Sequence, residues 1–208
     1  MEDKKEFLSI DTTAGIAPKK YELLPIYNDK NPNLRIKSVP FNFEKPQLDA
    51  QELAIRLDMT MRAYGGVGLA AIQCNIPLRV FALACDIVAF NPTILGLTEE
   101  TKREKEGCLS FPGIFLPITR PIGVQLEWYD EKGVKHTQEF TGLTARTILH
   151  EYDHLEGILF TGYVGNLTIQ MARKKRDKMI KRHERAKKQG LLLSDPKRII
   201  HPVGHQSE

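Results

Sequence analysis

Two histidines and a glutamate within five residues, His150, Glu151 and His154, are the side chains of this sequence best suited to chemistry. On a helix, residues four apart lie on one face, a turn of about 5.4 Å from each other. Two imidazoles placed in that way can bind one metal ion, and a glutamate beside them can take the proton of a metal-bound water. The spacing therefore predicts a hydrolytic metal site on a helix.

A catalytic metal of this kind needs a third protein ligand, for which the sequence offers several candidates. Phe160 stands where the extended pattern H-E-x-x-H-x-x-G-x-x-H would have a third histidine. Downstream carboxylates fit poorly, because Glu156 falls at the end of the same helix and Glu184 lies in a strongly basic segment. Upstream, Cys108 offers a thiol, and Gly107 before it allows close approach of the backbone. One thiolate, two imidazoles and a water would make an open tetrahedral site, with the pKa of that water lowered to ~7.

The elements that must position these residues include both helices and strands, without regular alternation. A helix is expected over residues 144–155, closed by Gly157, and it would carry the histidine motif. Apolar spacing predicts a second helix over residues 46–61, ended by glycines, and residues 167–189 form a long basic helical pattern. Strand-like runs cover residues 79–84, 87–90, 122–129 and 134–140. We predict an α+β fold with mainly antiparallel sheets packed around the motif-bearing central helix, followed by a C-terminal basic helix.

Charge is unevenly distributed along the chain. The formal net charge is +4, but residues 173–188 hold ten Lys or Arg against two acids, so this segment carries +8 and the remainder −4. Such a cluster is typical of a surface that attracts RNA phosphates, and also of a solvated helix that keeps a protein in solution. The expected division is an N-terminal extension (1–20), a catalytic domain (21–165), the basic helix (166–190) and a polar tail (191–208).

Composition favours a soluble protein of the cytoplasm. Of the 208 residues 41% are hydrophobic and 27% charged, and no apolar run approaches the ~20 residues that span a bilayer. The first residues carry acids and lack the apolar stretch of a secretory signal. Three cysteines, Cys74, Cys85 and Cys108, are an odd number, which argues against a disulfide framework.

Three separate segments share a pattern of glycines and polar residues. They are Gly66-Val67-Gly68-Leu69-Ala70-Ala71-Ile72-Gln73, Glu106-Gly107-Cys108-Leu109-Ser110 and His150-Glu151-Tyr152-Asp153-His154-Leu155-Glu156-Gly157. In their order and spacing they resemble the three signature motifs of the peptide deformylases, and weaker similarity runs from about residue 24 to residue 160. Three motifs in one order are far more specific than any one of them.

The resemblance implies a metal-dependent hydrolase that removes the N-formyl group from the formyl-methionine of nascent polypeptides. By position, Cys108, His150 and His154 would be the metal ligands, a metal-bound water the nucleophile and Glu151 the general acid/base. The groups facing the developing oxyanion would be the side-chain amide of Gln73 and the backbone N–H of Leu109. The residues lining the substrate would be Val67, Gly68, Gly107, Leu143 and Arg146. Arg146 could instead form an ion pair with a neighbouring acid.

The resemblance also implies one divalent metal ion, Fe²⁺ in the cell, with Zn²⁺, Ni²⁺ or Co²⁺ able to occupy the same ligand set in purified protein. The expected partners are N-formyl-methionyl nascent peptides and, through the basic helix, the ribosome; no membrane and no DNA is expected. Two other classes fit less well. A zinc endopeptidase would need a third ligand after His154, and an RNA-binding protein with a structural metal would offer four protein ligands.

Overall fold

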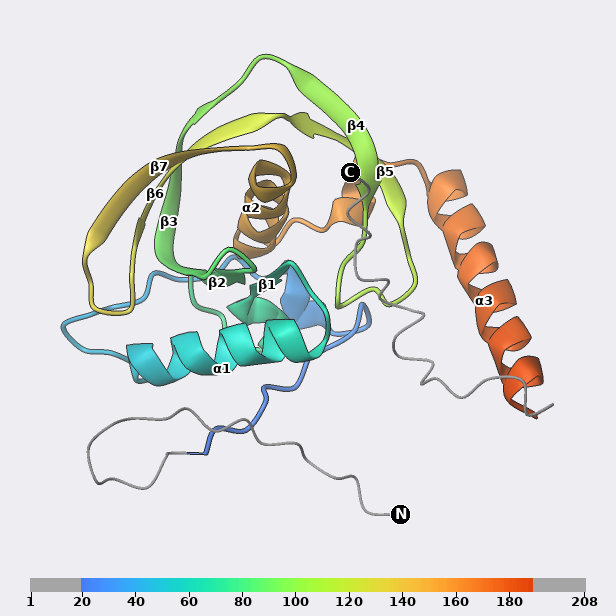
Figure 1. Ribbon diagram of the computed structural model, residues 1–208, viewed down its shortest axis with the longest axis horizontal. Helices are drawn as coiled ribbons and strands as arrows, with labels where there is room; N and C mark the ends of the chain where they lie inside the picture. Colours follow the sequence, from blue (N-terminus) through green and yellow to red (C-terminus); the bar gives the residue numbers. More distant parts are fainter. Residues whose placement is uncertain (1–19, 189–208) are drawn as a thin grey trace.

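The computed structural model describes residues 20–188 and has the α+β architecture that the sequence predicts (Figure 1). Its α-helices are α1 (Ala50–Ala63), α2 (Gly142–Leu155) and α3 (Asn166–Lys188). Its strands are β1 (Gly68–Ala70), β2 (Val80–Leu83), β3 (Ile87–Leu97), β4 (Thr101–Glu106), β5 (Leu116–Pro121), β6 (Gly123–Tyr129) and β7 (Lys135–Thr141). Short 3-10 turns are η1 (Pro32–Arg35), η2 (Ala71–Cys74) and η3 (Phe160–Tyr163). The predicted N-terminal extension, except residue 20, and the predicted polar tail lie outside the described residues.

A five-stranded antiparallel sheet, in the order β1-β2-β3-β6-β7, separates two helices. On β2, Val80 and Ala82 belong to the apolar cluster that includes α1, whereas Phe81 and Leu83 belong to the cluster that includes α2. Successive side chains of a strand point to opposite faces, so α1 and α2 cover opposite sides of the sheet. Helix α2 consequently runs through the interior, inside the curve of the sheet (Figure 1).

Helix α1 begins at a side-chain cap and ends at a glycine. Asp49 Oδ1 accepts the backbone N–H of Glu52 at 2.7 Å, which satisfies one of the free donors of the first turn. Beyond the helix Gly65 has a φ of +67°, a conformation open to glycine without steric cost. The predicted helix over residues 46–61 is confirmed, but it starts at residue 50 because the cap lies at Asp49.

A separate two-stranded sheet pairs β4 with β5, and neither strand is predicted from the sequence. Strand β4 reads Thr-Lys-Arg-Glu-Lys-Glu, and β5 contains two prolines. On β4, Glu106 is buried and Glu104 is partly exposed, and both pair with Arg146, which allows so charged a segment to form a strand. The predicted strand over residues 87–90 is too short, because β3 continues to Leu97 through irregular pairing with β6. The remaining predicted strands are confirmed to within one residue.

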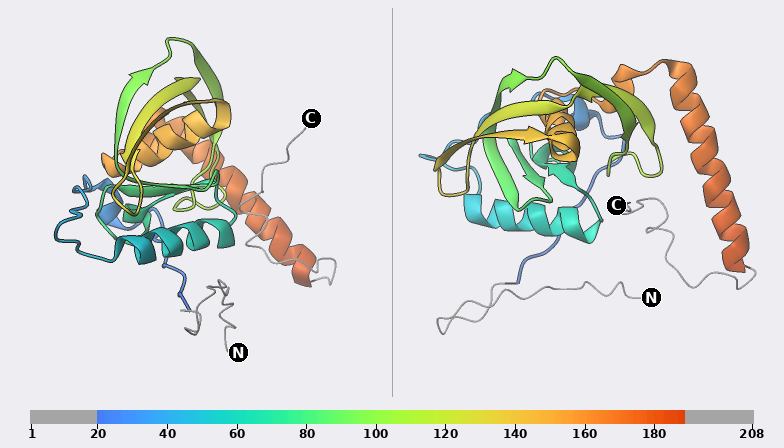
Figure 2. Two further views of the ribbon diagram at one scale, coloured as in Figure 1. Left: turned by 60° about the vertical axis from the view of Figure 1, so that its left-hand side comes forward. Right: turned by 45° about the horizontal axis from the view of Figure 1, so that its top comes forward.

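Helix α3 projects from the body after its first turns (Figure 2). Ile169 and Ala172 pack against an apolar cluster that contains Phe111 and Phe160. Leu167 is 71% exposed, so the attachment is one-sided. Within residues 20–188, no helix combines the length and the apolar character needed to cross a membrane.

Candidate metal centre

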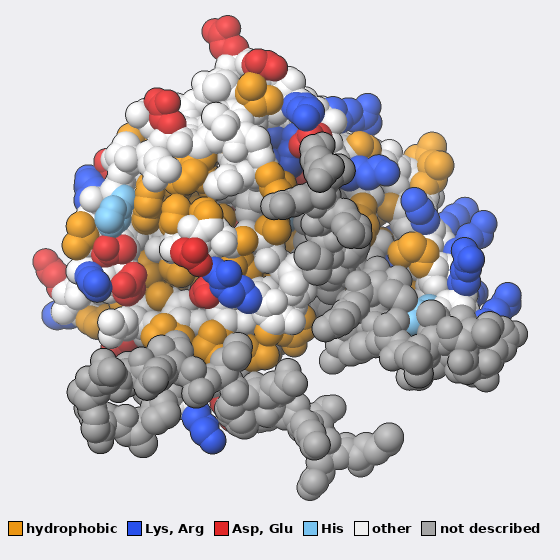
Figure 3. Space-filling model, viewed as in Figure 1, with side chains coloured by type: hydrophobic (Ala, Val, Ile, Leu, Met, Phe, Trp, Pro, Cys, Tyr) orange, Lys and Arg blue, Asp and Glu red, His pale blue; other side chains and the backbone are white. Residues whose placement is uncertain are grey.

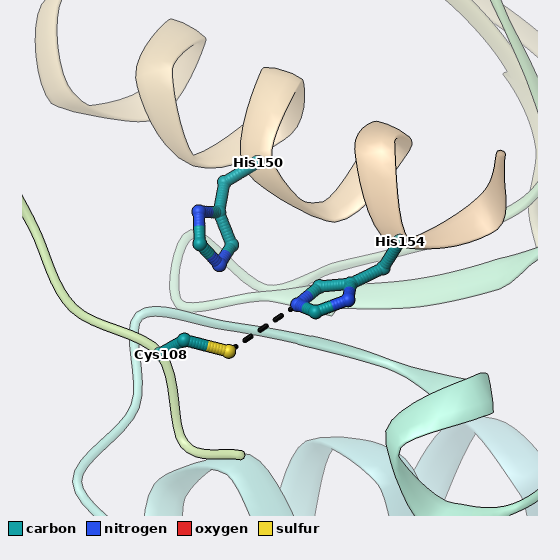
Figure 4. A group of neighbouring side chains, drawn as sticks. All are labelled: Cys108, His150 and His154. Carbon is teal, nitrogen blue, oxygen red and sulfur yellow. Dashed lines mark hydrogen bonds between the residues drawn. The ribbon is translucent and has the colours of Figure 1, made fainter. Parts of the chain in front are cut away.

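Three ligand atoms from two parts of the fold converge inside the molecule (Figure 4). Helix α2 presents His150 and His154 from one face, as their spacing predicts, and Cys108 lies two residues after the end of β4. The ligand atoms all lie within 4.8 Å of one another, and Cys108 Sγ is 3.3 Å from His154 Nε2. Helix α2 holds this position because Ile148 and Leu149, on its other side, are buried against the five-stranded sheet.

The donor set fits a divalent transition metal. His150 Nδ1 lies 3.0 Å from Glu106 Oε2, so this nitrogen carries the proton that it donates to the carboxylate. The opposite nitrogen, His150 Nε2, is buried and has no hydrogen-bond partner among the described residues. A buried lone pair without a partner is costly unless something binds it. His150 Nε2, the thiol of Cys108 and the imidazole of His154 together form a ligand set that suits zinc, iron, cobalt or nickel.

The carboxylate of Glu106 ties the ligand helix to the second sheet. It accepts bonds from Arg120 Nε at 2.7 Å, Arg146 Nη1 at 2.7 Å and His150 Nδ1 at 3.0 Å. Burial alone would raise the pKa of Glu106, but the bonds from His150 and Arg120 outweigh it and lower the pKa to about 2. The same arginine, Arg120, also donates to Asp153 on α2 at 2.8 Å. Such partners behind a ligand fix its ring orientation and its basicity.

Glu151 lies beside the ligand atoms in an almost closed environment. Its side chain is buried, and its Oε2 atom has no hydrogen-bond partner within residues 20–188. Burial raises the pKa of Glu151 to about 7. A Cβ added to Gly68 would stand only 2.4 Å from Glu151 Oε1, so the carboxylate packs closely against the main chain at Gly68, where a side chain would clash. A carboxyl group with a pKa near neutrality is suited to accept and return a proton.

Gln73 has its side-chain amide oriented by the backbone. The N–H of Ala70 donates to Gln73 Oε1 at 2.9 Å, which fixes the oxygen on that side. The Nε2 group therefore faces the site, 3.4 Å from Cys108 Sγ and 3.1 Å from Ser110 Oγ. A neutral donor is thus held beside the sulfur of Cys108.

A cavity of about 240 Å³ opens onto these groups. Every predicted site residue lines this cavity except His154, which is fully buried. The predicted residues on its wall are Val67, Gly68, Gln73, Gly107, Cys108, Leu109, Leu143, Arg146, His150 and Glu151. The site therefore combines a candidate metal-ligand set with an acid/base candidate beside one small cavity.

Comparison with known proteins identifies the family. The family described as "Polypeptide deformylase" matches residues 23–170. The chain belongs to this family. A peptide deformylase of Novosphingobium aromaticivorans is 35% identical over 72% of this chain and 94% of its own length. A solved peptide deformylase of Legionella pneumophila has a TM-score of 0.70 at 31% identity, covering 78% of this chain and 98% of its own. The class I type b peptide deformylase of Acinetobacter baumannii, solved with Met-Ala-Ser bound, has a TM-score of 0.63 at 28% identity, covering 68% of this chain and 98% of its own.

The chain is accordingly a peptide deformylase, an enzyme of the class that removes the formyl group from newly made polypeptides. In this deformylase Arg146 forms the ion pairs that the sequence left as its alternative role. Its guanidinium bonds to Glu104 at 3.1 Å and to Glu106 at 2.7 Å, and it also donates to backbone carbonyls of Lys102 and Ile118. The residue still forms part of the cavity wall.

Several residues that line the cavity are not predicted as site residues from the sequence. The additional cavity-lining residues are Gly65, Gly66, Lys105, Glu106, Phe111, Gly113, Ile114, Phe115 and Thr147. Glu106 could have been noticed as the first residue of the motif that contains Cys108. Arg120 has no local signal, because its role depends on partners far away along the chain.

Proposed function

We propose that the enzyme is a metal-dependent hydrolase of N-formyl-methionyl peptides in which Cys108, His150 and His154 hold the metal. The observation that carries the proposal is the convergence of these three ligand atoms beside a buried carboxylate, on the wall of one small cavity. A divalent ion bound there would act as a Lewis acid and lower the pKa of a water in its open position towards ~7. Element analysis of protein prepared without oxygen tests the further proposal that this ion is Fe²⁺ in the cell, replaceable by Zn²⁺, Ni²⁺ or Co²⁺.

Glu151 moves the proton in this mechanism. As the attacking water loses its proton, the carboxylate accepts it and then delivers it to the nitrogen of the leaving amine. Its burial supports this role, because a carboxyl with a pKa of about 7 both accepts and releases a proton near neutral pH. The side-chain amide of Gln73 and the backbone N–H of Leu109 would stabilise the charge that develops on the formyl oxygen.

The peptide would bind as an added strand. Strand β1 is an edge strand of the five-stranded sheet, so the outer side of its backbone is open for pairing. Val67 and Gly68 on that edge and Gly107 after β4 would hold the substrate backbone. Leu143 and the aliphatic part of Arg146 would receive the methionine side chain. The product-like Met-Ala-Ser bound to the Acinetobacter baumannii enzyme supports this kind of substrate.

Formate release from formyl-Met-Ala-Ser tests the proposal. The expected result is release of formate with the peptide bonds intact, and the Glu151→Ala variant should lose turnover while retaining one metal ion per chain. Cleavage of internal peptide bonds would instead indicate an endopeptidase. Turnover that survives in Glu151→Ala would exclude the acid/base role of this residue.

We further propose that the basic helix brings the enzyme to the ribosome, in the cytoplasm where nascent chains emerge. The support is charge: Lys and Arg side chains lie along the projecting part of α3 (Figure 3), and most of them are exposed. Clustered cations bind RNA phosphates through release of counterions, which makes binding sensitive to salt. The N-formyl-methionyl peptide would then be met as it leaves the ribosome.

Substitution tests this attachment more cleanly than truncation. Cutting the chain after Gly165 would also remove Ile169 and Ala172, which pack against the body. Replacing the exposed cations Lys174, Lys175, Lys178, Lys181 and Arg182 with Gln keeps good helix-forming residues. The expected result is loss of salt-dependent co-sedimentation with ribosomes and unchanged deformylation of free peptides. Co-sedimentation that persists in this variant would refute the attachment.

A further inference from the structure

Lys105 is the charged side chain on the cavity wall that faces solvent. It lies on β4 between Glu104 and Glu106, which both turn inward to Arg146. Because side chains alternate along a strand, Lys105 points to the other side of β4, where it is exposed and also lines the cavity. Lys105 is therefore the exposed charged residue among those that line the cavity.

The other ionised groups of this cavity are already neutralised or enclosed. Glu106 is paired with Arg120 and Arg146, and Arg146 is paired in addition with Glu104. Glu151 is buried at the inner end. Lys105, by contrast, forms no ion pair within the described part of the chain. A peptide that extends out of the cavity would therefore pass the positive charge of Lys105.

Lys105 is close enough to Cys108 along the chain to reach the early residues of a bound peptide. Two residues lie between Lys105 and Cys108, so their Cα atoms are at most about 11 Å apart. In an extended peptide whose formyl group lies at the ligand atoms, the second and third residues lie at a comparable distance. Around the mouth the exposed side chains of Val67, Phe115 and Leu143 are apolar, so they contact a peptide without selecting its charge.

We propose that Lys105 is a specificity-determining residue that favours an acidic side chain at the second or third position of the formyl-methionyl peptide. This inference rests on the proposed function, since it needs the peptide to leave through this cavity mouth. An ion pair between exposed groups changes binding by about two- to fivefold, and salt weakens it. The preference should therefore appear in KM, with kcat nearly unchanged.

The test compares C-terminally amidated peptides that differ in one charge. The pairs are formyl-Met-Asp-Ala-Ser with formyl-Met-Lys-Ala-Ser, and formyl-Met-Ala-Asp-Ser with formyl-Met-Ala-Lys-Ser. The ratio of kcat/KM, acidic over basic, should exceed about two for at least one pair at low salt and approach one at high salt. In the Lys105→Glu variant the ratio for that pair should fall below one, and in Lys105→Gln it should lie between.

Lys45→Glu is the matched control, because it makes the same change in net charge on an exposed residue that does not line the cavity. Its ratio should equal that of the unmodified enzyme. Equal ratios in Lys105→Glu and Lys45→Glu, or a preference that persists at high salt, would overturn the inference while deformylation itself continues. Absence of formate release from all four peptides would overturn the proposed function and the inference with it.

Discussion

Replacing Gly68 with Ala should disable the enzyme without removing its metal. The added Cβ would stand 2.4 Å from Glu151 Oε1 and 2.6 Å from Thr147 Cγ2, whereas ordinary contacts begin near 3.4 Å. Thr147 is buried and its hydroxyl donates to Leu143 O, so the carboxylate must give way by about 1 Å. A displacement of that size in a reacting group costs on the order of 100-fold in rate. We expect kcat to fall by about that factor for Gly68→Ala.

The control is Gly96→Ala, also within a strand. A Cβ there would meet nothing closer than Gln125 Oε1 at 3.7 Å, so kcat should stay within about twofold. Formate release measures the rate, and element analysis measures the metal content. A thermal melt measures the loss of stability from the added methyl group, which is about 1–3 kcal/mol for an overpacked site. Near-normal kcat in a folded Gly68→Ala enzyme would refute the reasoning.

A double variant shows whether the loss passes through Glu151. If the methyl group acts by displacing the carboxylate, Gly68→Ala should add little once Glu151→Gln has removed the charge. Additive losses would instead mean that Gly68 acts on the substrate backbone by itself. The comparison therefore separates the two roles that the geometry allows for Gly68.

Three further outcomes are expected. Glu106→Ala leaves two buried arginines without their shared partner, so the free energy of unfolding should fall by about 3–5 kcal/mol in urea titrations; an unchanged midpoint would contradict the buried network. In native protein at pH 8, iodoacetamide should modify exposed Cys85 but not Cys74, because burial raises the pKa of the Cys74 thiol to about 12. Mass spectrometry should find Cys108 modified only after a chelator has removed the metal. Above pH 9 the thiol of Cys74 ionises in the unfolded chain but stays protonated in the folded one. The free energy of unfolding should therefore fall as the pH rises to about 12, by about 1.4 kcal/mol per pH unit more than in Cys74→Ala. Equal slopes of this free energy against pH in the two proteins would show that the thiol is not protected.

The ligand helix could be predicted from sequence because its signals are local. His150 and His154 are one turn apart, and the apolar residues around them repeat with helical spacing. Cys108 is different, because nothing in its immediate neighbours fixes its distance from the histidines. It was identified as a candidate ligand from the order of the three motifs. The structure places its sulfur 3.3 Å from His154, across 46 residues of sequence.

The charge network behind the ligands could not be predicted in the same way. Glu106 meets Arg120 across 14 residues and Arg146 across 40, and such pairs leave no periodic pattern in the chain. For the same reason β4 reads as a charged surface segment, although its inward acids are neutralised. The cavity rim escaped prediction too, since Lys105 and Phe115 become neighbours of the site only when β4 and the loop before β5 fold over α2.

The placement of the three candidate ligands on two parts of the fold would give a bound ion a mechanical role. Cys108 is attached to the two-stranded sheet and the histidines to the helix that fills the larger one, so a metal held by all three would cross-link two structural units. Binding energy gained in this way is also folding energy. The melting temperature should then rise with the fraction of the enzyme that is loaded with metal.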